Sequence, residues 1–149
     1  MKLNKINKSP IKQFQKGFSL IELLLVITIG AILATVSIPS LFRAKRAAEK
    51  GAVINNLRTL STHQMSYMSV NGRYARLTEL NTFMGNNLGT ITGTSLYRGE
   101  YRYRMHPSSN PTNTYLKDRF AMRGTRSERG FIVFEIRIDS DGIITIIEE

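Results

Sequence analysis

Glu22 is the only charged side chain in the most apolar stretch of the 149-residue sequence, which runs from Phe18 to Ile38. An ionised carboxylate at mid-depth in a membrane costs on the order of 2.5 to 3.5 kcal/mol, so such a group is usually functional or paired. The chemistry that this position favours is ion pairing, and the partner of Glu22 should be a cation.

Nucleophilic, acid–base and metal chemistry have no comparable support in the sequence. There is no cysteine, the two histidines, His63 and His106, are far apart, and the G-x-S-x-G, H-E-x-x-H and phosphate-loop motifs are missing. Thiolate, disulfide and zinc-ribbon chemistry are thereby excluded. We expect a protein that is not an enzyme and that holds neither a cofactor nor a metal.

The apolar stretch predicts a membrane-spanning helix. Its length as an α-helix is about 30 Å, which matches the hydrocarbon core of a bilayer. Five lysines and no acid precede Gly17, which favours a cytoplasmic N-terminus, although basic residues also follow the stretch at Arg43, Lys45 and Arg46. A secretory signal peptide has a shorter apolar run and an A-x-A-like site behind it, so cleavage behind this run is not expected.

The segment Lys16–Leu23 (KGFSLIEL) resembles the processing site of type IV prepilins and of the related pseudopilins of type II secretion. It combines a basic leader that ends in glycine, a phenylalanine, a glutamate four residues further on and an apolar helix. The resemblance extends to about Leu60. It implies that an inner-membrane prepilin peptidase cleaves between Gly17 and Phe18 and methylates the new amine of Phe18. It also implies an inner-membrane assembly platform and a pilin-like fold.

The residue types at this site agree with that chemistry. Gly17 has no side chain to obstruct a peptidase. In a packed filament, Glu22 of one subunit would neutralise the Phe18 ammonium of its neighbour in a low-dielectric core, which would set the axial register. The alternative is local, because Glu22 near the membrane surface can also reach the lipid headgroups or pair with its own amine.

The helix is expected to continue beyond the membrane. Pro39 should kink its axis. Further along, a stripe of side chains recurs at helical spacing until Val70–Arg73 ends the helix. The stripe consists of Val53, Leu57, Leu60, Gln64 and Tyr67. It predicts that the second half of the helix packs against the C-terminal part of the same chain.

The C-terminal part predicts a small antiparallel sheet of three or four strands. Alternating side chains indicate strands at Glu100–Met105 and Phe131–Ile138. Asp139–Gly142 followed by Ile143–Ile147 completes a hairpin. The segment Asn81–Gly99 is rich in glycine, asparagine, threonine and serine, and this composition is typical of a connector loop.

Two further segments have structural predictions of their own. Tyr115–Met122 is an additional strand candidate, and Arg123–Gly130 is expected to be an exposed loop.

Arginines interleaved with tyrosine and phenylalanine can bind phosphates and stack on bases. The candidate polyanion or DNA contacts are Arg102, Arg104, Arg119, Arg123 and Arg126. Alternating arginine is also the ordinary solvated face of a half-buried sheet, which is the preferred interpretation. Half of the net charge of +10 belongs to the lysines of the leader, which weakens the case for a polyanion.

Asp139 and Asp141 are a candidate for calcium, which loops in some pseudopilins bind. Two acids fall short of the oxygen ligands that calcium needs, and their spacing does not fit an EF-hand, so an ordinary hairpin turn is preferred. Many type IV pilins staple the C-terminal region with a cysteine pair, whereas pseudopilins often do not. The lack of cysteine shifts weight toward pseudopilins without deciding the matter.

Taken together, these features predict an α+β protein in which a long N-terminal helix, transmembrane in its first half, packs on a small antiparallel sheet. Its parts are a basic leader that is cleaved off (1–17), a hydrophobic assembly helix (18–42), an amphipathic continuation (43–70) and a globular head (71–149).

The expected function is that of a structural subunit of a pilus-like filament. Before assembly the chain would lie in the lipid of the bacterial inner membrane, single-pass with a cytoplasmic leader. It would then form a homo-oligomer, or a hetero-oligomer with other pilins, in a pilus or pseudopilus. The alternatives are a pseudopilin of a type II secretion system and a minor pilin that binds DNA during uptake.

Overall fold

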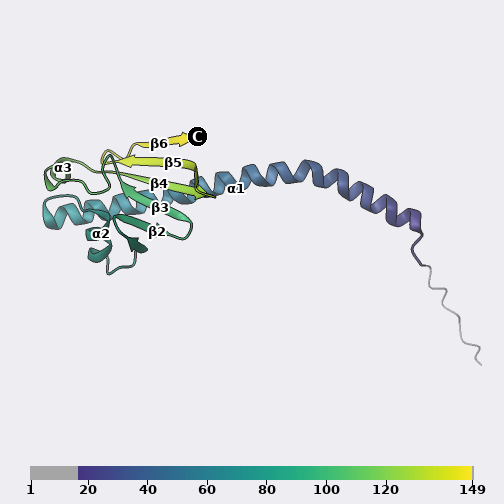
Figure 1. Cartoon of the computed structure of the whole chain (residues 1–149), viewed down its shortest axis with the longest axis horizontal. Coiled ribbons are helices and arrows are strands. Elements are labelled where there is room, and N and C mark those ends of the chain that lie inside the picture. Colours follow the sequence, from purple (N-terminus) through teal and green to yellow (C-terminus); the bar gives the residue numbers. More distant parts are fainter. Residues whose placement is uncertain (1–16, 149) are drawn as a thin grey trace, which may run out of the picture. The chain divides into compact units, whose positions relative to one another are not determined.

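The computed structural model describes residues 17 to 148, which form three helices and six strands (Figure 1). These residues fall into two compact units that divide between Phe42 and Arg43. We call them the N-terminal segment (Gly17–Phe42) and the head (from Arg43 onward). The elements are α1 (Leu20–Asn71), α2 (Leu77–Phe83), β1 (Thr90–Thr92), β2 (Ser95–Arg98), β3 (Tyr101–Met105), α3 (Asn113–Asp118), β4 (Ala121–Glu128), β5 (Phe131–Asp139) and β6 (Ile144–Glu148). Apart from Gly17, the predicted leader lies outside the described residues.

Helix α1 contributes residues to both units. It ends at Asn71, and Gly72 behind it adopts a φ of 67°, the left-handed conformation that commonly follows a helix C-terminus. The predicted stop at Val70–Arg73 is therefore confirmed. The helix is continuous through Pro39, and the kink expected there stays a prediction.

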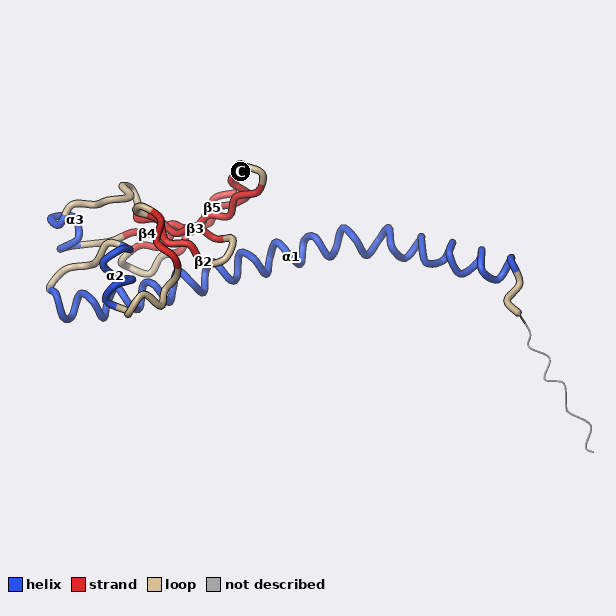
Figure 2. The backbone as a smooth tube through the Cα atoms, turned by 60° about the horizontal axis from the view of Figure 1, so that its bottom comes forward, coloured by secondary structure: helices blue, strands red, loops and turns tan. Residues whose placement is uncertain are grey.

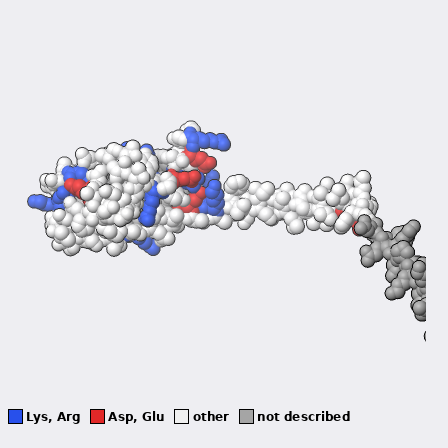
Figure 3. Space-filling model, turned by 90° about the horizontal axis from the view of Figure 1, so that it is seen from below, with Lys and Arg blue, Asp and Glu red and all other residues white. Residues whose placement is uncertain are grey.

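The N-terminal segment exposes an apolar surface along its whole length. The exposed fraction is 87% for Phe18 and 66% for Ile32, and Figure 3 shows the segment almost free of blue and red atoms, with red only near its start. Among the described residues, α1 is the helix long and apolar enough to cross a membrane. Such a surface is unfavourable in water and requires lipid or other apolar helices around it.

The second half of α1 forms one side of the head's core. Val53, Leu57 and Leu60 are fully or almost fully buried, and Tyr67 is 9% exposed. The polar member of the stripe, Gln64, is fully buried, and its amide donates to the carbonyl oxygen of Ala75 and accepts from its N–H, both at 2.8 Å. This pairing satisfies the buried amide. The predicted packing of the stripe within the chain is confirmed.

The sheet is a six-stranded antiparallel meander in the order β1-β2-β3-β4-β5-β6, so the expectation of three or four strands was too low. The strands predicted from alternation are confirmed as β3, β5 and β6. Figure 2 shows the sheet along one side of the C-terminal part of α1, with α2 and α3 toward the end of that helix. Tyr103, Gly124 and Ile136 are cross-strand neighbours on the face that packs on α1.

The segment Asn81–Gly99 was wrongly predicted to be a connector, because it contains the end of α2 and the β1–β2 hairpin. Asn81, which is 4% exposed, organises the chain between them. Its carboxamide oxygen accepts from the N–H of Leu88 at 3.1 Å, and its Nδ2 donates to the carbonyl of Gly89 at 3.3 Å. The polar composition of this segment therefore did not indicate that the Asn81 side chain supplies hydrogen bonds in place of regular backbone pairing.

The predictions for Tyr115–Met122 and Arg123–Gly130 were also wrong. The first segment contains most of α3, which is capped by the hydroxyl of Thr112 accepting from the N–H of Tyr115 at 3.3 Å. Most of the second belongs to strand β4, in which Thr125 and Arg126 are buried. The expected exposed loop is thus a central strand with charged residues.

Glu79 fixes the entry into α2 through several hydrogen bonds. The Arg73 guanidinium donates to both of its carboxylate oxygens, at 2.8 and 3.0 Å, and the N–H of Arg76 donates at 2.8 Å. The hydrogen bond from Arg73 is the main cause that lowers the pKa of Glu79 to about 2, against the opposing effect of burial. The carboxylate form therefore stabilises the fold.

We expect Glu79→Gln to lower the free energy of unfolding by about 1–2 kcal/mol at pH 7, a modest value because the side chain is 30% exposed and screened by solvent. A depressed pKa gives stability that is present above the ordinary value of 4.5 and is lost as the pH falls toward about 2. The difference between wild type and variant in urea unfolding should shrink over this range. With the exposed Glu128→Gln as control, a pH-independent difference for Glu79→Gln would contradict the assignment.

Candidate functional site

The predicted cleavage point lies immediately before the first turn of α1. Gly17, Phe18 and Ser19 are not helical, and the helix begins at Leu20. The Phe18 side chain is 87% exposed. A peptide bond in an irregular segment is open to a peptidase, because its N–H and carbonyl are not part of a helical ladder. The geometry is compatible with proteolysis between Gly17 and Phe18, which remains a prediction.

Glu22 lies in the first turn, where its carboxylate accepts a hydrogen bond from the backbone N–H of Ser19 at 3.0 Å. This is the half of a capping box in which the acid three residues into the helix satisfies the backbone of the cap. The sequence contains this capping signal, S-x-x-E before an apolar run. Because Glu22 was interpreted as an ion-pairing residue, the cap was not predicted. Glu22 also favours the helix electrostatically, since a carboxylate is stabilised at the positive end of the helix dipole.

Arg126, one of the five candidate polyanion contacts, is 9% exposed and forms ion pairs within the head. Its guanidinium pairs with Glu49 of α1 and, at 3.1 Å, with Glu100 between β2 and β3. These partners neutralise its charge. The role of Arg126 as a polyanion contact stays a prediction, and its burial between two acids does not favour that role.

Three other candidates, Arg102, Arg104 and Arg123, lie on the face of the sheet opposite α1. They alternate with the buried Tyr103, Met105 and Met122, and strand geometry directs alternate side chains to opposite faces.

The sheet adds a fourth arginine to this face. Arg137 of β5 is the cross-strand partner of Arg123, and Arg123 is also the partner of Arg104. We call Arg102, Arg104, Arg123 and Arg137 the arginine face. Arg137 was not among the candidates, although its place in the alternating strand could have indicated it.

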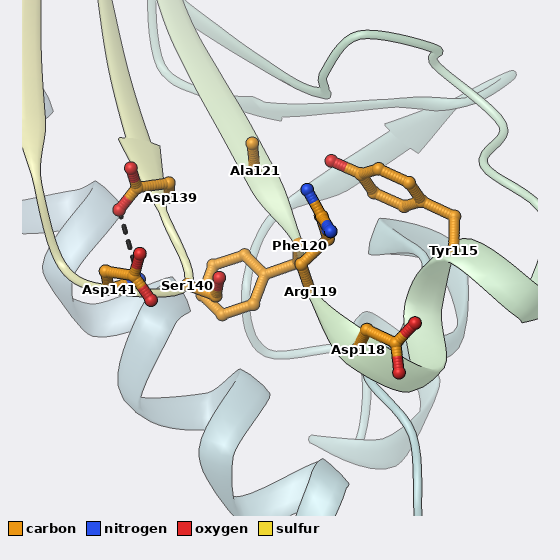
Figure 4. Close-up of a pocket in the computed structure, with 8 residues that line it drawn as sticks. All are labelled: Tyr115, Asp118, Arg119, Phe120, Ala121, Asp139, Ser140 and Asp141. Atoms are coloured by element: carbon orange, nitrogen blue, oxygen red, sulfur yellow. Dashed lines mark hydrogen bonds between the residues drawn. The ribbon is translucent and has the colours of Figure 1, made fainter.

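Arg119 and the calcium candidates line a cleft of about 400 Å³ at the end of β5 (Figure 4). The carboxylate of Asp139 accepts from the N–H of Asp141 at 3.1 Å and from the N–H of Ile143 at 2.9 Å. Asp139 thus closes the hairpin turn. Among the described residues, no group of three or more acidic, histidine or cysteine side chains is placed to hold a metal ion.

An apolar helix that begins shortly after a glycine–phenylalanine bond, in a chain with an α+β head, resembles the plan of type IV pilins and pseudopilins. Residues 12–38 match the family described as the prokaryotic N-terminal methylation motif. The N-terminal segment is therefore similar to those of proteins that carry this motif.

Three relatives agree with this class. The type IV wide pilus major component PilA4 of Thermus thermophilus is 46% identical over 59 residues, which is 40% of this chain and 45% of the relative. The type IV major pilin protein PilA of Myxococcus xanthus is 37% identical over 60 residues, 40% of this chain and 27% of the relative. The type II secretion system core protein G of Klebsiella michiganensis is 35% identical over 63 residues, 42% of this chain and 44% of the relative. Each match covers less than half of the relative's length.

Proposed function

We propose that this protein is a structural subunit of a type IV pilus-like filament, inserted in the bacterial inner membrane before assembly. The observation that carries the proposal is the methylation motif over residues 12–38, together with a helix whose described apolar side chains are exposed from Leu20 to Phe42. Lateral contacts among leucine, isoleucine and valine side chains of neighbouring helices would replace lipid contacts. Assembly then buries this surface without exposing it to water.

The maturation step that we propose is cleavage between Gly17 and Phe18 by a prepilin peptidase, followed by methylation of the Phe18 amine. The non-helical bond and the exposed Phe18 side chain support it. Cleavage produces an ammonium close to Glu22, whose carboxylate already lies at the N–H of Ser19. In the filament, Glu22 would neutralise the Phe18 ammonium of a neighbouring subunit; pairing with its own amine is the local alternative.

Mass spectrometry of the protein from cells tests this maturation. We expect a mature chain that starts at Phe18 and carries the additional mass of one methyl group at its amine. Gly17→Val should leave the precursor uncleaved, because a branched side chain before the bond obstructs the peptidase. Ser19→Ala keeps the backbone N–H that Glu22 binds and should be processed normally. Uncleaved precursor in wild-type cells would overturn the proposal.

A pseudopilin of type II secretion is the second candidate, supported by the match to core protein G. The two candidates share the membrane helix and the processing site, and they differ in the assembly machinery. Genes for a secretion system or for pilus assembly beside this one would distinguish them.

A further inference from the structure

We infer that the arginine face of the head is a binding site for single-stranded nucleic acid, which would contact the arginines through its phosphates and Tyr97 through a base. This inference does not depend on filament assembly. It rests on the register of four strands, the hydrogen bonds of the arginines and the exposure of one tyrosine.

The register concentrates positive charge at the centre of the sheet. Arg104, Arg123 and Arg137 are direct cross-strand partners on β3, β4 and β5. With strands about 4.8 Å apart, the row spans about 10 Å. Like charges that face each other across strands are destabilising, so an anion that bridges them would relieve a repulsion built into the fold.

Glu135 is the acid that lies among these arginines, and its side chain is 11% exposed. Its two carboxylate oxygens pair with Arg123 at 3.4 Å and with Arg137 at 2.5 Å. One carboxylate shared by two of four arginines leaves the face with a net positive charge. By contrast, Arg126 on the opposite face has two acids of its own.

The arginines also retain unused hydrogen-bond donors. Within the described residues, the hydrogen bond donated by Arg104 runs from Nε to the hydroxyl of Ser95 at 3.0 Å, which leaves its terminal nitrogens for a ligand. The Nε atoms of Arg102 and Arg123 have no partner in the described part of the chain, but they are buried, so a ligand would be bound by the terminal nitrogens. A guanidinium presents five donors in a planar fork that matches phosphate oxygens.

His106 follows β3 on the same face and responds to this charge. Burial is the main cause that lowers the pKa of its imidazole, and Arg137 and Arg123 lower it further against the opposing effect of Glu135. The lowered pKa disfavours the charged imidazole, so His106 adds no fixed positive charge to the face. Its Nδ1 is buried without a partner in the described part of the chain.

The dimensions of the face favour a chain of phosphates over a single ion. The row of about 10 Å, together with the about 7 Å between residues two apart on a strand, gives room for more than one phosphate. Tyr97 on β2 is the cross-strand partner of Arg102 and is 36% exposed. An exposed aromatic ring beside arginines is the combination that binds unpaired bases, because every base has a face that can stack.

Fluorescence anisotropy of a labelled oligothymidylate tests this site on the full chain in a neutral detergent. We expect binding that weakens with salt. The double variant Arg123→Gln with Arg137→Gln should weaken binding roughly tenfold at low salt and reduce the slope of log affinity against log salt by about 1.4, since each phosphate contact on a single strand contributes about 0.7. Tyr97→Leu should weaken binding about fivefold or more with little change in slope.

A control with the same net charge replaces two arginines away from the face, Arg98→Gln with Arg129→Gln, and should change the affinity less than twofold. Melting temperatures identify variants that fail to fold, and Arg104→Gln then serves as a milder replacement. Absence of salt-dependent binding, or an equal loss in the control, would overturn the site. The nucleic-acid assignment is wrong if Tyr97→Leu binds the oligonucleotide normally and the wild-type protein binds inorganic polyphosphate equally well. In that case the face binds polyanions without contacting bases.

Discussion

Glu22→Ala is expected to abolish filament assembly while the leader is still removed. The cleavage point precedes Glu22 by four residues, so the peptidase can still act on the Gly17–Phe18 bond. The assembled state loses the partner of the Phe18 ammonium, and a cation left unpaired in a low-dielectric core costs about 3–5 kcal/mol. The membrane-inserted state gains at the same time, because alanine removes a carboxylate that is costly in lipid. Both changes oppose extraction from the membrane.

The measurement compares filaments sheared from cells with the processed subunit that remains in the membrane fraction. We expect at least a tenfold loss of filaments with mature subunit still present. Ser19→Ala, which keeps the backbone N–H that Glu22 binds and changes neither the charge nor the apolar surface, is the matched control. Normal filaments from Glu22→Ala would exclude the register role and leave Glu22 as a helix cap, in agreement with its hydrogen bond to Ser19.

Gly124→Val should unfold or severely destabilise the head. A Cβ atom at Gly124 would lie 2.6 Å from a methyl group of Val53 on α1 and 2.9 Å from the ring of Tyr103 on β3. All three residues are buried, so neither neighbour can move into solvent. Inserting atoms into a packed core costs about 1–3 kcal/mol, and valine adds more atoms than alanine at a point where β4 packs directly against α1.

A double-mutant cycle separates this collision from other effects of the substitution. We expect Gly124→Ala to lower the free energy of unfolding by about 1–3 kcal/mol, and Val53→Ala to recover part of that loss when the two are combined. Gly51→Ala is the control, because nothing lies within 4 Å of a Cβ there, and it should be neutral or stabilise the helix by up to about 1 kcal/mol. Additive effects of Gly124→Ala and Val53→Ala would show that the two sites do not touch.

The parts of the fold that were predictable are those in which a local pattern and the tertiary structure agree. Val53, Leu57 and Leu60 recur at helical spacing, and their burial follows from that spacing alone. The β5–β6 hairpin was evident because strict alternation flanks a turn whose aspartate bonds the backbone that follows it. Such signals do not require knowledge of distant residues.

The missed elements depend on contacts that are distant in sequence. The sequence of β4 alone favours an exposed loop, because a charged residue can be buried in a sheet only where its partners are present. In the structure, Glu49 and Glu100 are the partners that allow Arg126 to be buried. The β1–β2 hairpin similarly depends on Asn81, which holds Leu88 and Gly89 from a neighbouring helix. Composition alone favours a loop in both cases.

The sequence by itself indicated the class of the protein, because the residues that predict cleavage, membrane insertion and helix formation lie close together between Lys16 and Ile38. It also determined that arginines are plentiful in the head, but not which of them act together. Only the tertiary structure decided that, because the strand register places Arg126 beside Glu49 and Glu100. The same register aligns Arg104, Arg123 and Arg137 on the opposite face. The physical reason is that strand geometry assigns each side chain to a face, and only pairing between strands determines its neighbours.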